Sequence, residues 1–186
     1  MNRSMQWKKW RSQMVINHKW CRVRQDTVEL PNGIIIDDFF VNIRPDIALI
    51  FALTAQQEVI FVRQYRHGVE KILLELPAGA FDPTVESAEV AAKREIGEET
   101  GYLATSLIKL ATLYDNPVKD TNSIHLFFTE AVYNPQLKQL DITEDIDVIL
   151  VPLSEIYDKI KAGEFCVSGT LTALFLGLDY LQQNSV

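Results

Sequence analysis

The sequence predicts an α/β fold in which helices cover both faces of a mixed β-sheet, preceded by a small antiparallel β arm. Two observations lead to this prediction. Segments with the composition of strands occur both before and after a helical pattern that ends at Gly101, and two more helical patterns close the chain. With 186 residues, 47% of them apolar, the chain can bury one substantial core. We therefore expect a single layered domain and the arm.

Residues 1–45 are expected to form the arm. Cys21–Leu30 has strand composition, and the turn at Pro31–Gly33 connects it to a second strand that ends near Ile43. These segments predict a β-hairpin, and Pro45 marks the expected boundary with the main domain, residues 46–186. Three tryptophans precede or border the hairpin: Trp7, Trp10 and Trp20. We interpret them as residues that fix the arm to its own sheet or to a partner subunit, because buried aromatic area is a commoner use than ligand stacking.

The main domain is expected to contain five strands and three helices. The first strand is apolar enough to be central in the sheet. The expected strands are Ile47–Thr54, Val59–Arg66, Leu107–Tyr114, Ser123–Tyr133 and Asp145–Leu153, and the segment Lys71–Gly79 between the second and third of them stops at a Pro-Ala-Gly breaker. The first helix begins between Asp82 and Ser87, both suitable N-caps, and ends at Gly101. The closing helices are Ser154–Ala162 and Ser168–Gln182; in the second, Leu171, Leu174, Phe175, Leu178 and Leu181 repeat at helical spacing and are predicted to be core.

Composition excludes several classes of function. The net charge of -7 argues against a nucleic-acid or anionic-membrane surface, and no apolar run approaches the roughly 20 residues of a membrane helix. The two cysteines, Cys21 and Cys166, form no CxxC pair and no signal-like leader is apparent, so a cytoplasmic location is expected. The three histidines are dispersed without the spacing of metal ligands.

Three glutamates of the first helix carry the sharpest indication of function. Glu95, Glu98 and Glu99 stand at positions i, i+3 and i+4, so their carboxylates share one helical face. Two unit charges about 4 Å apart repel by roughly 4 kcal/mol at an effective dielectric constant near 20. The cluster therefore predicts a bound divalent cation with a preference for oxygen ligands. Small residues align with the glutamates on the same face and allow a close approach to the sheet: Ala88, Ala91 and Ala92.

The residues around this cluster resemble the Nudix box, GX5EX7REUXEEXGU. Gly79, Glu86 and the run from Arg94 to Gly101 agree with its polar and glycine positions. The sequence departs from the pattern in two places: six residues rather than five separate Gly79 from Glu86, and Tyr102 replaces an aliphatic residue. The extra residue leaves the spacing within the helix intact, so we expect it to change the shape of the loop that precedes Glu86.

The resemblance implies a Nudix-type α/β/α sandwich with a mixed sheet, and hydrolysis of a diphosphate assisted by Mg²⁺, with Mn²⁺ as a substitute. It implies Glu95 and Glu99 as direct metal ligands, Glu98 as a shared or outer ligand with a catalytic role, and the backbone carbonyl of Ala78 as a further ligand. Arg94 would then be structural and pair with Glu86 or Glu95.

Flanking motifs are similar to those of ADP-ribose pyrophosphatases, and this similarity covers nearly the whole chain. The motifs are Arg63–Arg66 before Leu74–Gly79, the TVELPNG hairpin, and Pro117 about 15 residues after the box. By this resemblance Arg66 contacts the diphosphate, and Glu75 and Trp20 belong to the substrate site, Trp20 as an aromatic on the adenine. Lys119 could supply a second cation; a solvated loop lysine is the alternative. Relatives exchange the arm between subunits, which implies a homodimer.

The box itself offers no general base, because its glutamates are expected to hold metal. The resemblance points to the loop before the last strand, where Glu144 is the first candidate and Asp141 and Asp145 are alternatives. The sequence thus predicts a Mg²⁺-dependent hydrolase that converts ADP-ribose, or a related nucleoside diphosphate sugar, to a nucleoside monophosphate and a sugar phosphate. Hydrolysis of GDP-mannose is the alternative within this chemistry, and a non-catalytic module that senses ADP-ribose is the alternative of another class.

Overall fold

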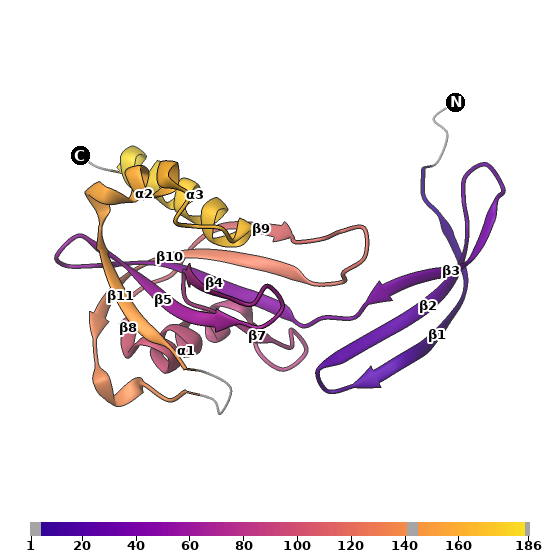
Figure 1. Cartoon of the computed structure of the whole chain (residues 1–186), viewed down its shortest axis with the longest axis horizontal. Helices are drawn as coiled ribbons and strands as arrows, with labels where there is room; N and C mark the ends of the chain where they lie inside the picture. Colours follow the sequence, from indigo (N-terminus) through magenta and orange to yellow (C-terminus); the bar gives the residue numbers. More distant parts are fainter. Residues whose placement is uncertain (1–4, 141–144, 185–186) are drawn as a thin grey trace. The chain divides into compact units, whose positions relative to one another are not determined.

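The computed structural model describes residues 5–140 and 145–184. The described chain divides into two compact units. The first contains the residues up to Pro45 together with Tyr114–Asn122, and the second contains Asp46–Leu113 and the residues from Ser123 onward. Figure 1 labels most of the elements of both units.

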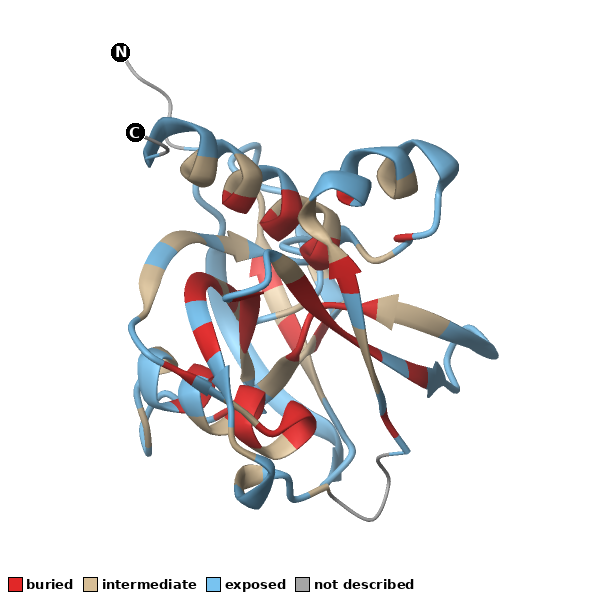
Figure 2. Cartoon of the chain, turned by 90° about the vertical axis from the view of Figure 1, so that its left-hand side faces the viewer, coloured by how far each residue is buried: buried red, intermediate tan, exposed pale blue. Residues whose placement is uncertain are grey.

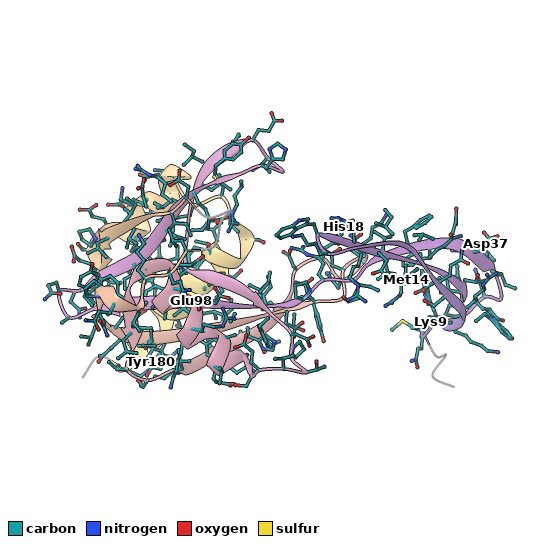
Figure 3. The ribbon with its side chains drawn as sticks, turned by 90° about the horizontal axis from the view of Figure 1, so that it is seen from below. Lys9, Met14, His18, Asp37, Glu98 and Tyr180 are labelled. Atoms are coloured by element: carbon teal, nitrogen blue, oxygen red, sulfur yellow. The ribbon has the colours of Figure 1, made fainter. Side chains whose placement is uncertain are left out.

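The first unit is built on an antiparallel sheet whose described strands have the order β1-β2-β3. The strands are β1 (Lys8–His18), β2 (Cys21–Glu29) and β3 (Ile35–Asn42), so the predicted hairpin is confirmed and β1 is an addition to it. The sequence does not indicate β1 because its register shifts twice and all of its residues are exposed, which removes the two-residue burial pattern. Figure 3 shows the side chains of Lys9, Met14 and His18 along this strand and of Asp37 on β3.

The segment Tyr114–Asn122 completes the first unit by packing against the end of β3. The backbone N–H of Asn42 donates to the carbonyl of Lys119 at 2.7 Å, and the Asn42 Nδ2 donates to Asp120 Oδ1 at 2.7 Å. Arg44 Nη1 lies 3.1 Å from Asp120 Oδ2 and 3.6 Å from Asp115 Oδ2. A loop that follows the box in sequence is therefore fixed to the arm by paired charges and backbone hydrogen bonds.

The second unit contains a mixed sheet, in which eight strands lie within the described residues. Its main path has the order β11-β5-β4-β10-β8, with β6, β7 and β9 paired to β5, β4 and β10. The strands are β4 (Asp46–Thr54), β5 (Glu58–Arg66), β6 (Lys71–Glu75), β7 (Ala78–Phe81), β8 (Tyr102–Ala104), β9 (Ile108–Tyr114), β10 (Ser123–Tyr133) and β11 (Asp147–Pro152). Strands β4 and β10 run parallel, and the apolar β4 is central, as predicted.

Helices cover both faces of this sheet, which confirms the predicted α/β class (Figure 1). Helix α1 (Ala88–Thr100) lies on one face, and α2 (Ile156–Ala162) and α3 (Ser168–Asn184) lie on the other; short 3-10 helices occupy Pro135–Leu137 and Leu153–Glu155. Each face has its own core. Ile50, Ile60 and Phe127 pack with the alanines of α1, whereas Phe51, Phe61 and Leu126 pack with Ile156 and Leu174. In Figure 2 the buried residues, coloured red, gather in the central strands of the sheet and in parts of the helices that cover it.

Three local features differ from the sequence prediction. The segment Lys71–Gly79, for which no strand is predicted, contains β6 and the start of β7, and Pro77 separates the two strands because it has no N–H to donate to a continuous ladder. Strand β8 is only three residues long and follows the helix directly, so it is too short to show a periodic pattern in the sequence. Phe175, predicted to be core, is 46% exposed and packs edge-on against Tyr157 with ring centroids 6.2 Å apart.

Within residues 5–140 and 145–184, no helix has both the length and the apolar content of a membrane span.

Candidate active site

Helix α1 has well-defined ends, and these set the direction of its acidic face. The Ser87 Oγ accepts a hydrogen bond from the Val90 N–H at 3.3 Å, which makes Ser87 the N-cap. At the other end Gly101 adopts the left-handed conformation with φ 74° and its N–H donates to the carbonyl of Gly97. Both boundaries agree with the sequence prediction. The phase of the helix is therefore fixed, and with it the face on which the glutamates lie.

The acidic face of α1 is directed toward the sheet. Ala91 and Ala92 are fully buried, and one turn later Glu95 and Glu99 are only 8% and 3% exposed. The Ala78 N–H donates to Glu99 Oε2 at 3.1 Å. These carboxylates thus occupy the interface between the helix and the start of β7, where desolvation makes an unbalanced charge costly.

Glu95 lies directly on the backbone at Gly79. A Cβ atom at position 79 would stand 1.8 Å from Glu95 Cδ and 2.1 Å from its Oε1, far inside van der Waals contact. Glycine at this position therefore lets the Glu95 carboxylate lie against the backbone, and a larger residue would force the end of the Glu95 side chain to move. The Ala78–Gly79 backbone is accordingly the place where Glu95 and Glu99 converge.

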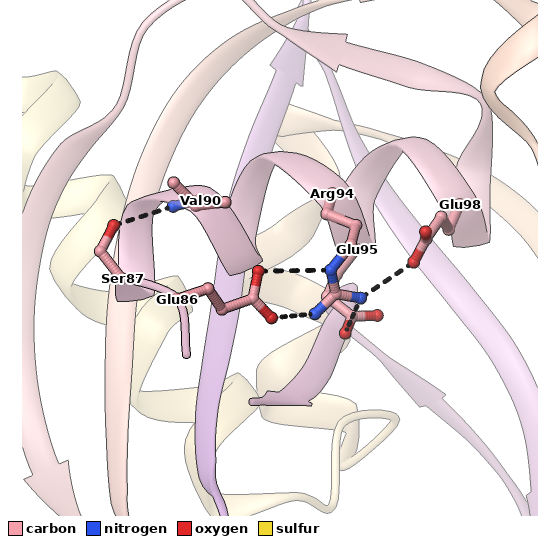
Figure 4. A network of polar contacts seen from close by, with 6 residues as sticks. All are labelled: Glu86, Ser87, Val90, Arg94, Glu95 and Glu98. Atoms are coloured by element: carbon pink, nitrogen blue, oxygen red, sulfur yellow. Dashed lines mark hydrogen bonds and ion pairs between the residues drawn. The ribbon is translucent and has the colours of Figure 1, made fainter. Parts of the chain in front are cut away.

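Arg94 offsets part of the negative charge of this acidic group (Figure 4). Its Nη2 donates to Glu86 Oε1 at 2.7 Å, and its Nη1 donates to Glu95 Oε1 at 2.7 Å and to Glu98 Oε2 at 2.9 Å. The hydrogen bond with Glu86, followed by those with Glu95 and Glu98, raises the pKa of Arg94 above its ordinary value in spite of partial burial. One guanidinium fork therefore organises three carboxylates.

The extra residue of the box is accommodated in a closed turn. Asp82 Oδ1 accepts hydrogen bonds from the N–H and the hydroxyl of Thr84 at 2.9 and 2.7 Å. The Asp82 carbonyl accepts from the N–H of Val85 at 2.9 Å and of Glu86 at 3.1 Å. This turn places Glu86 within hydrogen-bond distance of Arg94 in spite of the extra residue.

The helix α1 glutamates offer oxygen atoms as possible ligands for a divalent cation. Among the described residues, no group of three or more His, Cys, Asp or Glu side chains is close enough together to hold a metal ion as they stand. Arg94 lies between Glu95 and Glu98 by virtue of its hydrogen bonds to both. The chemistry of the donors nevertheless fits: carboxylate oxygens reach the peptide backbone at Ala78 and Gly79, and hard cations select oxygen.

Arg66 and Glu75, both predicted to bind substrate, form an ion pair. Arg66 is the last residue of β5, and its Nε and Nη2 lie 2.8 and 2.6 Å from Glu75 Oε2. Glu75 is buried, whereas the Arg66 side chain is 46% exposed. A guanidinium has five N–H donors, of which Glu75 engages two. The buried Glu75 carboxylate thus orients the exposed Arg66 guanidinium, whose remaining N–H donors can bind an anion.

The remaining predicted residues belong to other segments of the chain. Trp20 and Lys119 belong to the first unit; Trp20 is 71% exposed, in the β1–β2 turn, with Lys19 Nζ 4.6 Å from its ring centroid. Glu144 and Asp141, the candidates for the general base, lie outside the described residues. Asp145 is described, and it lines a cavity of about 270 Å³ with Arg63 and Tyr65.

The first unit has a cavity that the sequence did not indicate. It has a volume of about 500 Å³ and is lined by aromatic, apolar and charged side chains, among them Trp7, Phe39, Val41, Arg24, Asp26 and Lys119. Trp7 and Phe39 meet edge-on with centroids 5.4 Å apart. The only local signal is the alternation of Arg24, Asp26 and Val28 along β2, and it mixes charged with apolar residues, which hides their common face.

Two family models match consecutive regions of the chain. The family model described as the NUDIX domain matches residues 43–167, and the one described as the nucleoside diphosphate sugar hydrolase N-terminal domain matches residues 7–42. A solved structure described as an ADP compounds hydrolase superposes with a TM-score of 0.82 over 98% of this chain and 99% of that one. At 24% sequence identity, this likeness concerns the fold.

Three curated relatives align over most of the chain. The ADP-ribose pyrophosphatase of Bacillus subtilis (strain 168) is 31% identical over 158 residues, which cover 84% of this chain and 82% of the relative. The methanol dehydrogenase activator of Bacillus methanolicus is 30% identical over 173 residues, 92% of this chain and 90% of the relative. The GDP-mannose pyrophosphatase of Escherichia coli (strain K12) is 34% identical over 137 residues, 69% of each.

Proposed function

This chain belongs to the NUDIX family and is a Nudix pyrophosphohydrolase, and we propose that it hydrolyses the diphosphate bond of ADP-ribose or a related nucleoside diphosphate sugar with Mg²⁺. The products are a nucleoside monophosphate and a sugar phosphate. One observation carries the proposal: Glu95 and Glu99 converge on the backbone at Ala78 and Gly79, three residues after the Glu75 that holds Arg66.

The short segment Glu75–Gly79 connects the two kinds of charge that diphosphate hydrolysis requires. At its start, Arg66 is oriented by the buried Glu75 and offers forked donors to phosphate oxygens. At its end, the α1 carboxylates supply oxygen ligands for a cation. Both parts lie on the second unit, so a single body contains the residues that bind the diphosphate and those that hold the metal.

In this proposal Glu95, Glu99, Glu98 and the Ala78 carbonyl hold Mg²⁺, or Mn²⁺ as a substitute. When bound, the ion supplies charge neutralisation on the diphosphate and lowers the pKa of water. Arg94 keeps Glu95 and Glu98 in position, and Arg66 fixes the substrate. The proton acceptor is predicted to be Glu144, with Asp141 and Asp145 as the alternatives; all three lie near the beginning of β11 in sequence, where a carboxylate can take the proton of the attacking water.

The choice of ADP-ribose is supported by the 31% identity to the B. subtilis pyrophosphatase over most of both chains. GDP-mannose is the second candidate, supported by the 34% identity to the E. coli enzyme. The box residues serve the diphosphate and carry little information on the base, so both substrates suit the same site.

Incubation of the purified protein with Mg²⁺ and a panel of nucleoside diphosphate sugars, followed by chromatography, tests the proposal. ADP-ribose should release AMP, and chelation by EDTA should stop the release. Brisk cleavage of GDP-mannose with no turnover of ADP-ribose would move the assignment to the second candidate. Binding of ADP-ribose without release of AMP would instead identify a sensing module.

Two glutamate variants test the carboxylate assignment separately from the substrate. Glu98→Gln and Glu99→Gln should each lower kcat by roughly 10-fold to 100-fold, because a neutral amide is a poor ligand for a hard cation. Glu89→Gln is the matched control, since Glu89 is an exposed acid of the same helix. Unchanged turnover in both box variants would reject the metal assignment whatever the substrate.

A homodimer formed through the arm and a cytoplasmic location are further parts of the proposal. The eleven residues of β1 are all exposed, and the exposed apolar side chains among them, such as Trp10, Met14 and Ile16, favour a protein partner. Light scattering at micromolar concentration should give twice the mass of the chain; a monomeric mass would refute the dimer.

A further inference from the structure

The connection between β6 and β7 leads into the backbone that contacts the carboxylates of α1. Strand pairing does not fix the first half of this connection. The β5–β6 ladder ends at Glu75, and the β4–β7 ladder begins at Ala78. Leu76 and Pro77 lie between the two ladders. Their backbone groups are buried within the second unit and need other hydrogen-bond partners.

These partners come from β4 and α3. The Pro77 carbonyl accepts a hydrogen bond from the Ile50 N–H of β4 at 2.9 Å. The Leu76 N–H donates to the Thr170 Oγ1 at 3.2 Å. Leu76 is 1% exposed and Thr170 is fully buried, so water cannot replace this bond without a rearrangement.

Helix α3, which carries Thr170, packs closely on the sheet. A Cβ at Gly177 would stand 2.8 Å from two ring carbons of Phe51 on β4, so the helix could not adopt this separation with a larger residue there. Ala173 and Leu174 are fully buried in the same contact. Helix α3 covers the face opposite to α1, so Thr170 acts on the connection from the far side of the sheet (Figure 1).

We propose that Thr170 is a positioning residue for the site: its hydroxyl fixes the Leu76 N–H and thereby the Ala78–Gly79 backbone on which Glu95 and Glu99 converge. The NUDIX family model ends at residue 167, so this residue lies outside the matched region. The consequence for metal and turnover rests on the proposed function, whereas the consequence for the backbone does not.

Amide hydrogen exchange tests the backbone part directly in the unmodified protein. The Leu76 amide should exchange slowly, as a buried hydrogen-bonded group does. Thr170→Val keeps the shape of the side chain and removes the hydroxyl, so exchange at Leu76 should become roughly tenfold faster. Thr170→Ser keeps the hydroxyl and should restore slow exchange. Fast exchange at Leu76 in the unmodified protein would overturn the proposal without any variant.

Binding of Mn²⁺, measured by calorimetry without substrate, tests the effect on the site. Thr170→Val should weaken Mn²⁺ binding by roughly tenfold, the range found when the residues that support metal ligands are removed, and Thr170→Ser should remain within about twofold of the parent. Thr172→Val is the matched control, because Thr172 Oγ1 bonds only the carbonyl of Ser168 in its own helix among the contacts described. Circular dichroism confirms that each variant is folded.

Turnover then separates the two proposals. If the parent cleaves a nucleoside diphosphate sugar, Thr170→Val should lower kcat with little change in KM, since Arg66 is untouched. If the parent cleaves none but the exchange and Mn²⁺ results hold, the assignment of Thr170 stands and the proposed function fails. If folded Thr170→Val matches the parent in exchange and Mn²⁺ binding, the assignment of Thr170 is wrong.

Discussion

Arg94 Nη2 lies 2.7 Å from Glu86 Oε1, although the turn before Glu86 contains one residue more than the box pattern has. The turn closed by Asp82 absorbs that residue, and the helix keeps its spacing. The ion pair therefore ties the turn to the middle of α1, and through the same guanidinium to Glu95 and Glu98.

Arg94→Lys should weaken this arrangement in a measurable way. An ammonium cannot reproduce the fork that reaches three carboxylates, so the free energy of unfolding should fall by about 1 kcal/mol, a modest value because the site is partly exposed. Urea denaturation measures this change. Lys93→Arg is the control, as Lys93 is the exposed neighbour on the same helix. A stability equal to that of the parent would show that the fork has no energetic role.

Gly79→Ala should displace the Glu95 carboxylate, because the new Cβ would lie 1.8 Å from Glu95 Cδ. We expect a loss of about 1–3 kcal/mol in the free energy of unfolding, typical of overpacking, together with weaker Mn²⁺ binding in calorimetry. Gly68→Ala provides the contrast, since nothing lies within 4 Å of a Cβ at Gly68. Equal behaviour of the two variants would contradict the close contact.

Arg66→Lys should raise KM for the diphosphate substrate by about tenfold or more, equivalent to about 1.4 kcal/mol, because a single ammonium replaces a forked donor. Steady-state kinetics measure the effect. Arg63→Lys is the matched control on the same strand, since Arg63 forms a 2.7 Å ion pair with Asp147 in which both side chains are exposed. Similar KM values for both variants would remove Arg66 from the substrate site.

Asp26 should make the stability of the first unit depend on pH. Burial acts to raise its pKa, but hydrogen bonds from Ser12 at 2.5 Å and Arg24 at 3.0 Å outweigh burial and hold the pKa below its ordinary value of 3.8. A carboxylate with a lowered folded pKa stabilises the protein above the unfolded value, and this stabilisation disappears as the pH falls through the folded value.

Asp26→Asn should therefore lower the free energy of unfolding by about 1.5–3 kcal/mol at pH 7, and the difference from the parent should shrink below about pH 3.8. Urea denaturation over a pH series measures it. Asp37→Asn is the control, because Asp37 is exposed on β3. A difference that grows toward acid pH would have the wrong sign for this argument.

The features that the sequence predicted well are those that short stretches determine. Helix α1 was predicted with both ends because Ser87 and Gly101 are local signals, and β4 was predicted as central because its residues are apolar on both faces. The acidic face follows from helical spacing alone. Each of these inferences requires only a window of about one element.

The features that were missed depend on contacts between distant residues. The Thr170–Leu76 hydrogen bond spans 94 positions, and the Asn42–Asp120 bond spans 78. Strand β1 is held by pairing to β2 and carries no burial pattern of its own. No periodicity or spacing in one region of the sequence records which remote backbone group a side chain will meet, so these contacts required the structure.

The attachment of Tyr114–Asn122 to the end of β3 has a consequence for exchange of parts between relatives. Asp120 contacts both Asn42 and Arg44, so an arm transplanted from a homologue at Pro45 would separate these partners. A chimera would keep Asp115 and Asp120 of the recipient, but the transplanted arm need not have an arginine at the position of Arg44 to pair with them. The transferable piece is discontinuous: the arm and the later nine residues must be inherited together.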